Sequence, residues 1–83
     1  MNWKKLKSFK SIAEYKSLNQ AAKSLDNSQS NLSRIVKTLE TSCGQELFLR
    51  HAKGIHLTDS GKKLLKIVNQ FNDEIKFFSK LNT

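Results

Sequence analysis

The chain has 83 residues, of which 15 are Lys or Arg and 7 are Asp or Glu, so its net charge is +8. This length corresponds to one small domain, and the charge excludes an acidic solvating tail and favours a polyanionic partner. Leu, Ile, Val and Phe make up about 28% of the residues, above the ~20% below which charged chains stay disordered.

Several classes of protein and site are excluded by what the sequence lacks. The single cysteine, Cys43, excludes an internal disulfide and a cysteine-based metal site, and it fits a reducing compartment. No run approaches the ~18 apolar residues of a membrane span, and no apolar run follows the first residues as in a signal peptide. His51 and His56 lack nearby acidic or thiol ligands, and no catalytic grouping or glycine-rich phosphate loop is present. We therefore expect no enzyme activity, no metal ion, no cofactor and no membrane span.

The first part of the chain is predicted to form two helices followed by a turn. Asn19 is a favourable N-cap residue for a short second helix over residues 20–25, and Asp26-Asn27 is a typical turn dipeptide. A stripe at helical spacing predicts a longer first helix over residues 3–16. The stripe consists of Trp3, Leu6, Phe9, Ile12 and Ala13.

The third helix, over residues 28–43, has the clearest boundaries. Ser28 is its N-cap candidate, and Gly44 stands where a helix ends in the left-handed conformation. Its apolar stripe consists of Leu32, Ile35, Val36, Leu39 and Cys43. We interpret Cys43 as a buried packing thiol. A short helix, a tight turn and a second amphipathic helix together form a helix-turn-helix.

A hairpin and a long helix are predicted for the remaining residues. The β-capable runs 47–50 and 55–57 flank a loop that ends in Gly54. Thr58 as N-cap and Asp59 in the first turn begin a helix that runs to about residue 80. The expected fold is therefore mainly α-helical with a small β-hairpin, ending in a long C-terminal helix.

One side of the third helix is polar, opposite its apolar stripe. The amides of Gln29 and Asn31 can pair with adenine, Arg34 can pair with guanine, and serine hydroxyls can bond bases or phosphates. Residues 29–38 contain no carboxylate, whereas an ordinary solvated helix face more often mixes Glu with Lys. The sequence therefore predicts a surface that binds double-stranded DNA. Its predicted residues are Ser28, Gln29, Ser30, Asn31, Ser33, Arg34, Lys37 and, in the hairpin, Lys53.

Two basic residues of the hairpin could also contact DNA. Lys53, beside Gly54, has the position of a wing tip that reaches a neighbouring groove or phosphate. A lysine in a turn is usually only solvated, so the wing role holds only if the helix-turn-helix does. Arg50 could hold the hairpin or contact DNA, and the sequence leaves both roles open.

The C-terminal helix carries an apolar seam with alternating steps of four and three residues. The seam consists of Leu64, Val68, Phe71, Ile75 and Phe78. Two heptads are fewer than the ~3–4 that identify a coiled coil, and the seam could serve only to pack on the small core. Further apolar residues lie off the seam, and a domain of this size has too little core to cover them all. We therefore expect a homodimer through this helix, with two recognition helices on successive turns of one DNA face.

Two other functions remain open at this point. The chain could be a non-catalytic dimerisation or protein-interaction module that does not read a DNA sequence, or a basic surface that binds anionic membranes. Membrane binding favours cations along one side of a strongly apolar helix. The third helix presents Ser, Asn, Gln and Arg there instead, which suits the edges of bases.

Several motifs occur together in one order. They are SLNQAAKSL (17–25), SQSNLSRI (28–35), LE (39–40), Gly44, LF (47–48), Arg50 and LTDSG (57–61). Over nearly the whole chain they resemble the N-terminal DNA-binding domain of LysR-type transcriptional regulators. The resemblance implies a winged helix-turn-helix over residues 1–58 and a linker helix that dimerises over residues 59–83. It also implies a bacterial, cytoplasmic protein associated with DNA.

The resemblance also assigns roles to individual residues. By position, Gln29, Ser33 and Arg34 are implied to contact DNA from the recognition helix in the major groove. Lys53 is implied to contact DNA from the wing, on the minor-groove side. The family usually has proline and alanine where this chain has Ser-Asn at 30–31, so we expect the fold to be kept and the base preference to differ. Family members usually continue with an effector-binding domain of two α/β lobes, so we expect no small-molecule effector site in this chain.

Overall fold

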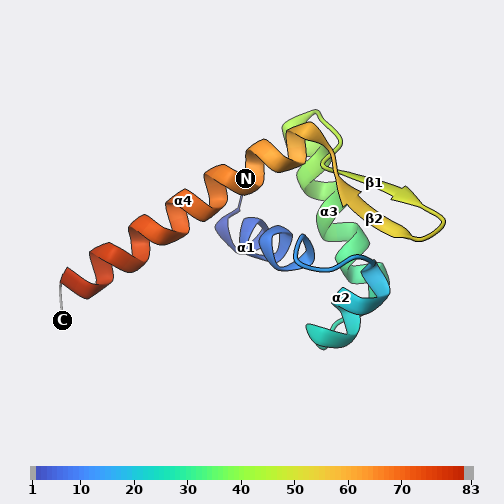
Figure 1. Cartoon of the computed structure of the whole chain (residues 1–83), viewed down its shortest axis with the longest axis horizontal. Coiled ribbons are helices and arrows are strands. Elements are labelled where there is room, and N and C mark those ends of the chain that lie inside the picture. Colours follow the sequence, from blue (N-terminus) through green and yellow to red (C-terminus); the bar gives the residue numbers. More distant parts are fainter. Residues whose placement is uncertain (1, 82–83) are drawn as a thin grey trace.

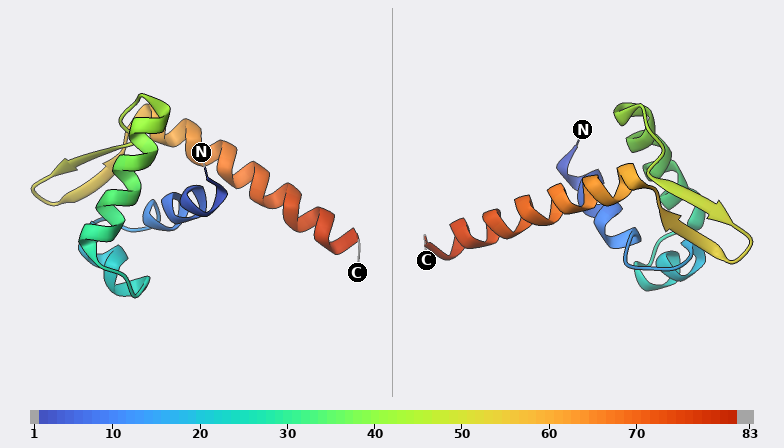
Figure 2. Two further views of the ribbon diagram at one scale, coloured as in Figure 1. Left: turned by 180° about the vertical axis from the view of Figure 1, so that it is seen from behind. Right: turned by 45° about the horizontal axis from the view of Figure 1, so that its top comes forward.

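The computed structural model describes residues 2–81, which form four helices and a two-stranded antiparallel sheet (Figure 1). In chain order the elements are α1 (Trp3–Ile12), α2 (Leu18–Ser24), α3 (Gln29–Cys43), β1 (Phe48–His51), β2 (Gly54–Leu57) and α4 (Asp59–Leu81). The hairpin and α4 extend in different directions from the group formed by α1, α2 and α3 (Figures 1 and 2). This arrangement confirms the predicted winged helix-turn-helix with a long C-terminal helix.

The first helix is shorter than predicted, because the chain turns after Ile12. Its N-cap is Asn2, whose Oδ1 accepts a hydrogen bond from Lys4 N at 2.7 Å. The predicted helix over residues 3–16 is wrong at its C-terminal end, since α1 stops at Ile12. Beyond it, the Lys16 carbonyl accepts a hydrogen bond from Ile55 N of β2 at 2.8 Å. Between Ile12 and that contact, Glu14 N and Tyr15 N donate to the carbonyls three residues earlier, at 3.2 Å and 3.1 Å, so the chain has left the α-helical pattern in tight turns.

Both helices of the helix-turn-helix begin at a capping serine, and a tight turn joins them. Ser17, not Asn19 as predicted, is the N-cap of α2, because its backbone is extended and its Oγ accepts from Gln20 N at 3.1 Å. Asp26 has a positive φ of 52° in the tight turn, which confirms the predicted turn. Ser28 caps α3 as predicted, and Gly44 ends it with φ 69°, a conformation that glycine adopts without a steric penalty.

The hydrophobic core lies where α1, α2, α3 and the hairpin meet. Phe9 and Phe48 contact each other edge-to-face with ring centroids 5.5 Å apart. Cys43 is partly buried and packs against this core. The buried members of the core cluster are Phe9, Ile12, Ala21, Ala22, Leu32, Val36, Leu39, Leu47, Phe48 and Ile55.

A single carboxylate joins the end of α3 to the start of the hairpin. Glu40 Oε2 accepts hydrogen bonds from the backbone of Leu47 at 2.7 Å and of Phe48 at 3.3 Å. The Leu47 carbonyl in turn accepts from Thr58 N at 3.0 Å, and Thr58 Oγ1 accepts from Gly61 N at 2.9 Å. Thr58 is therefore the predicted cap of α4, and these contacts fix the root of the hairpin between two helices.

The hairpin is regular and is held close to the connection between α1 and α2. Its pairing aligns Phe48 with Leu57 and His51 with Gly54, which confirms the predicted hairpin with a shift of about one residue in each strand. Gly54 has a φ of 143°, and a Cβ atom there would lie 2.1 Å from the Lys16 carbonyl oxygen. Only glycine allows this approach of the two backbones.

The C-terminal helix has a buried part and a projecting part. Gly61 and Val68 are buried, and Leu64 and Leu65 pack against the core. Val68 is 1% exposed within the chain, so this position of the predicted seam contributes to the packing of a single copy. Beyond it, α4 projects away from the other elements (Figure 1). Within residues 2–81, no helix combines the length and the apolar content needed to cross a bilayer.

The backbone approach at Gly54 predicts a loss of stability in Gly54→Ala. The added methyl group would displace the Lys16 carbonyl and require a strained backbone, at a cost of about 1–3 kcal/mol. Urea unfolding measures this difference, with the neighbouring exposed substitution Lys53→Ala as the control that leaves the free energy of unfolding unchanged. Equal stability of Gly54→Ala and the unsubstituted chain would contradict the described contact between β2 and Lys16.

Candidate nucleic-acid interface

The polar side of α3 faces away from the chain because its opposite side is buried. Leu32, Val36 and Leu39 are 1%, 5% and 1% exposed, and they pack into the core. The predicted DNA-binding residues of the helix are exposed or half-exposed, and none of them is buried. The helix therefore presents them as one continuous surface. We call this surface the polar face of α3, which comprises Ser28, Gln29, Ser30, Asn31, Ser33, Arg34 and Lys37.

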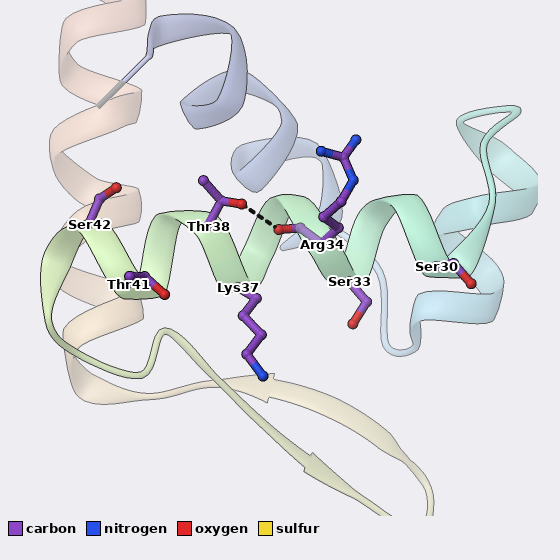
Figure 3. Close-up of a pocket in the computed structure, with 7 residues that line it drawn as sticks. All are labelled: Ser30, Ser33, Arg34, Lys37, Thr38, Thr41 and Ser42. Carbon is purple, nitrogen blue, oxygen red and sulfur yellow. Dashed lines mark hydrogen bonds between the residues drawn. The ribbon is translucent and has the colours of Figure 1, made fainter.

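Part of the polar face lines a shallow hollow. Figure 3 shows Ser33 and Lys37 directed toward the hairpin, and Arg34 and Thr38 directed to the other side of the helix. Thr38 Oγ1 donates to the Arg34 carbonyl at 2.9 Å, so this hydroxyl is already used within the helix. The residues that line the hollow are Ser30, Ser33, Arg34, Lys37, Thr38, Thr41 and Ser42.

The N-terminal end of the polar face is tied to α2. Ser28 Oγ accepts from Asn31 N at 3.0 Å, so its hydroxyl oxygen serves the helix cap. Gln29 Nε2 donates to Asn19 Oδ1 at 3.2 Å. This bond joins the first turn of α3 to the first turn of α2. It orients the Gln29 side chain while leaving its carbonyl oxygen as an acceptor.

Three polar side chains form a hydrogen-bonded series from the turn before α3 into that helix. Asn31 Nδ2 donates to Asn27 Oδ1 at 2.9 Å, and Arg34 donates from its guanidinium to Asn31 Oδ1 at 2.5 Å. Asn31 and Arg34 are three residues apart on α3 and therefore adjacent on the helix, whereas Asn27 lies in the turn before it. One N–H group of Arg34 is used in this bond. Because a guanidinium has five donors, enough remain for a two-bond contact with a guanine.

The hairpin is also joined to the polar face. The guanidinium of Arg50, on β1, donates a hydrogen bond to Ser33 Oγ on α3. The structure thus places Arg50 in contact with the recognition helix, which supports the holding role that the sequence left open. The same bond occupies the Ser33 hydroxyl oxygen with a charged donor, so a DNA phosphate near Ser33 would meet Arg50 as well.

Lys53 lies apart from the hollow, in the turn of the hairpin. Its side chain is exposed, and its backbone N donates to His51 Nδ1 at 3.3 Å. His51 and His56 lie on the same hairpin with ring centroids 5.1 Å apart. The structure does not bring Lys53 together with Arg34. It places the two cations on separate elements, the wing and the recognition helix.

The local charge of the polar face is positive. Residues 29–38 carry Arg34 and Lys37 and no acidic residue. The next carboxylate along α3, Glu40, is half-buried and accepts from the backbone of the hairpin, as described above. Its carboxylate is therefore engaged by two backbone N–H groups, and residues 29–38 present hydroxyls, amides and cations to an approaching polyanion.

Sequence reasoning missed two residues that orient this surface. Asn27 is predicted only as a turn residue. It is four residues from its partner Asn31, but it lies before α3, so the spacing rule for helices does not identify this contact. Asn19 was assigned as a helix cap, whereas it accepts a hydrogen bond from Gln29, ten residues away. No local pattern indicates that second contact, since it depends on how α2 packs against α3.

The comparisons with known proteins agree with one another on one family. Residues 3–62 match the model of the bacterial regulatory helix-turn-helix protein, lysR family. The chain is 37% identical over 76 residues to the HTH-type transcriptional regulator CzcR of Bacillus subtilis (strain 168), covering 92% of this chain and 26% of that protein. It is 44% identical over 64 residues to the nitrogen assimilation regulatory protein nac of Escherichia coli (strain K12), covering 77% of this chain and 21% of that protein.

A solved structure resembles nearly the whole chain. The crystal structure of the complex of CbnR_DBD with DNA superimposes with a TM-score of 0.86 at 29% identity, covering 99% of this chain and 94% of that one. The chain spans about a quarter of the length of the curated relatives it matches. With the family model matched over most of its residues, the chain belongs to the lysR family of bacterial regulatory helix-turn-helix proteins.

Proposed function

We propose that this chain is the sequence-specific, double-stranded DNA-binding domain of a LysR-family transcriptional regulator. The observation that carries the proposal is the polar face of α3, which is exposed, free of carboxylates and backed by a net charge of +8. An α-helix with such a face fits the major groove, where amides and a guanidinium read base edges. Two relatives are named as regulators, and CbnR_DBD was solved with DNA, which supports the same activity here.

In this proposal the residues divide into base-reading and backbone-binding groups. Arg34 and Gln29 read bases, because each retains hydrogen-bonding groups beyond its internal contact. Ser28, Ser30 and Lys37 contact phosphates near the N-terminal half of α3. Ser33 does so together with Arg50, and Lys53 contacts the backbone or the adjacent groove from the wing. The protein acts in the bacterial cytoplasm, bound to DNA, and residues 1–58 form the DNA-binding part.

We further propose that residues 59–83 form a linker helix that pairs two copies. Residue 1 of the segment 1–58 and residues 82–83 of the segment 59–83 lie outside the described residues. Since Val68 is buried and Leu64 packs on the core, the pairing surface consists mainly of the exposed end of the seam. Phe71, Ile75 and Phe78 are 46%, 45% and 63% exposed there. A water-exposed apolar stripe of this kind is stabilised by burial against a second copy.

The proposal predicts that Arg34→Ala weakens binding to the preferred DNA site by about 1–3 kcal/mol and relaxes discrimination at one base pair. The preferred site is obtained first by selecting bound DNA from a random pool, and affinities are then measured at one fixed salt concentration. Lys76→Ala, on the projecting part of α4, removes an equal charge far from α3 and serves as the control. An equal loss on preferred and random DNA would make Arg34 a phosphate contact, and a pool that yields no preferred site would refute sequence-specific binding.

Lys53→Ala is predicted to weaken binding to all DNA sequences alike. Each phosphate contact contributes about 0.9 to the slope of log K against log salt concentration, so removing one contact lowers that slope by about 0.9. Titrations of preferred and random DNA at several salt concentrations measure both effects. A loss confined to one base step would mean that the wing reads a base and would contradict the backbone role.

The pairing proposal predicts that Ile75→Ser weakens the dimer. In a two-fold interface Ile75 occurs twice, once in each copy. Burying one such side chain contributes about 1.5–3 kcal/mol. Losing both contributions should raise the dimer dissociation constant by about 100-fold or more. Sedimentation equilibrium measures this constant. Phe77→Ser removes an exposed apolar side chain that lies off the seam, and it should leave the dimer largely intact. Dimerisation unchanged by Ile75→Ser would place the pairing surface elsewhere.

A further inference from the structure

Both ends of the Asn31 amide are occupied by neighbouring side chains. Its Nδ2 donates to Asn27 Oδ1 at 2.9 Å, and its Oδ1 accepts from the Arg34 guanidinium at 2.5 Å. An asparagine that reads adenine in the major groove needs the amide donor and the acceptor for the same base. One N–H and one acceptor site of the Asn31 amide remain, but the two internal hydrogen bonds fix its orientation, so turning the amide toward a base would break them.

We propose that Asn27 and Asn31 are positioning residues that hold the Arg34 guanidinium in place, and that Asn31 does not read a base itself. The inference rests on the proposed function, in which Arg34 contacts a base. It assigns a role to Asn27, which lies before α3, and it changes the role of Asn31 from a direct contact to a support for Arg34.

This series of hydrogen bonds begins at Asn27, whose backbone is itself bonded to α2. Asn27 N donates to the Ala22 carbonyl at 2.9 Å, at the end of α2. Asn27 Oδ1 also accepts from Ser28 N at 2.8 Å, so its side chain is held from two directions. The tight turn between α2 and α3 therefore orients Asn27, Asn27 orients Asn31, and Asn31 orients Arg34.

Holding Arg34 in this way affects specificity more than general affinity. An arginine side chain has many rotamers, and fixing one of them on binding costs conformational entropy. The hydrogen bond to Asn31 supplies part of this ordering before DNA arrives. A freely moving guanidinium could still attract any phosphate, whereas a two-bond contact with one guanine requires a defined position. Loss of the support should therefore reduce discrimination and leave binding to random DNA nearly unchanged.

The test compares discrimination at the base pair that Arg34 reads. Affinities for the selected site and for its single-base variants are measured for Asn31→Ala, Asn27→Ala, Arg34→Ala and the double variant Asn31→Ala with Arg34→Ala. We expect Asn31→Ala and Asn27→Ala each to lower discrimination at that base pair by about fivefold, the contribution of about one hydrogen bond. The double variant should discriminate no less than Arg34→Ala alone, because Asn31 acts through Arg34.

Two matched variants separate positioning from folding. Asn27→Asp keeps the oxygen that accepts from Ser28 and Asn31, so it should retain the discrimination, whereas its added charge weakens binding to all sequences alike. Gln70→Ala removes an exposed amide from α4, away from α3, and should leave binding unchanged. Thermal unfolding of every variant reports whether the helix-turn-helix is intact, and Asn31→Ala tests the inference if Asn27→Ala is unfolded.

The outcomes distinguish this inference from the proposed function. If Arg34→Ala affects neither discrimination nor affinity, the proposed role of Arg34 fails, and the inference falls with it. If Arg34→Ala abolishes discrimination but Asn31→Ala leaves it unchanged, only the positioning role is wrong. If Asn31→Ala changes the preference at a different base pair, additively with Arg34→Ala, then Asn31 reads a base directly and the inference is overturned.

Discussion

The burial of one side of α3 is the constraint on which the other features of the molecule depend. Leu32, Val36 and Leu39 lie in the core with Phe9 of α1 and Phe48 of the hairpin, and this packing allows only one rotation of α3 about its own axis. Because helical residues three and four apart share a side, burying these three side chains exposes the opposite side. The polar face of α3 is thus a consequence of core packing. A rotation of the helix that covered Arg34 would also expose the core.

Hydrogen bonds from three neighbouring segments then join this face to α2, to the turn before α3 and to the hairpin. Asn19 holds Gln29 from α2, Asn27 holds Asn31 from the turn, and Arg50 holds Ser33 from the hairpin. Each bond starts on a different element, so α2, α3 and the wing are fixed relative to one another near the proposed DNA-binding surface. Such preorganisation lowers the entropy lost on binding, since fewer side chains remain to be ordered.

The long helix α4 serves two parts of the molecule. Its first turns complete the small core through Val68 and neighbouring residues, and the capping contacts at Thr58 and Gly61 join it to the hairpin. Its later turns project from the domain and carry exposed aromatic and aliphatic side chains. Trp3 of α1 and Phe71 of α4 meet edge-to-face, with ring centroids 4.9 Å apart, between these two parts. The proposed pairing surface is therefore continuous with the core.

The sequence by itself determined the helix-turn-helix, the hairpin, the boundaries of α3 and the residues of its polar face, because each follows from local rules of periodicity and capping. Ser28 and Gly44 end α3 through their own backbone preferences, and the apolar stripe determines which side is buried. Only the tertiary structure decided where α1 ends, because the segment after it turns to meet β2 at Lys16, and that Ser17 rather than Asn19 caps α2. It also divided the seam of α4 between core and surface. These features depend on contacts between residues distant in the chain, which no local pattern records.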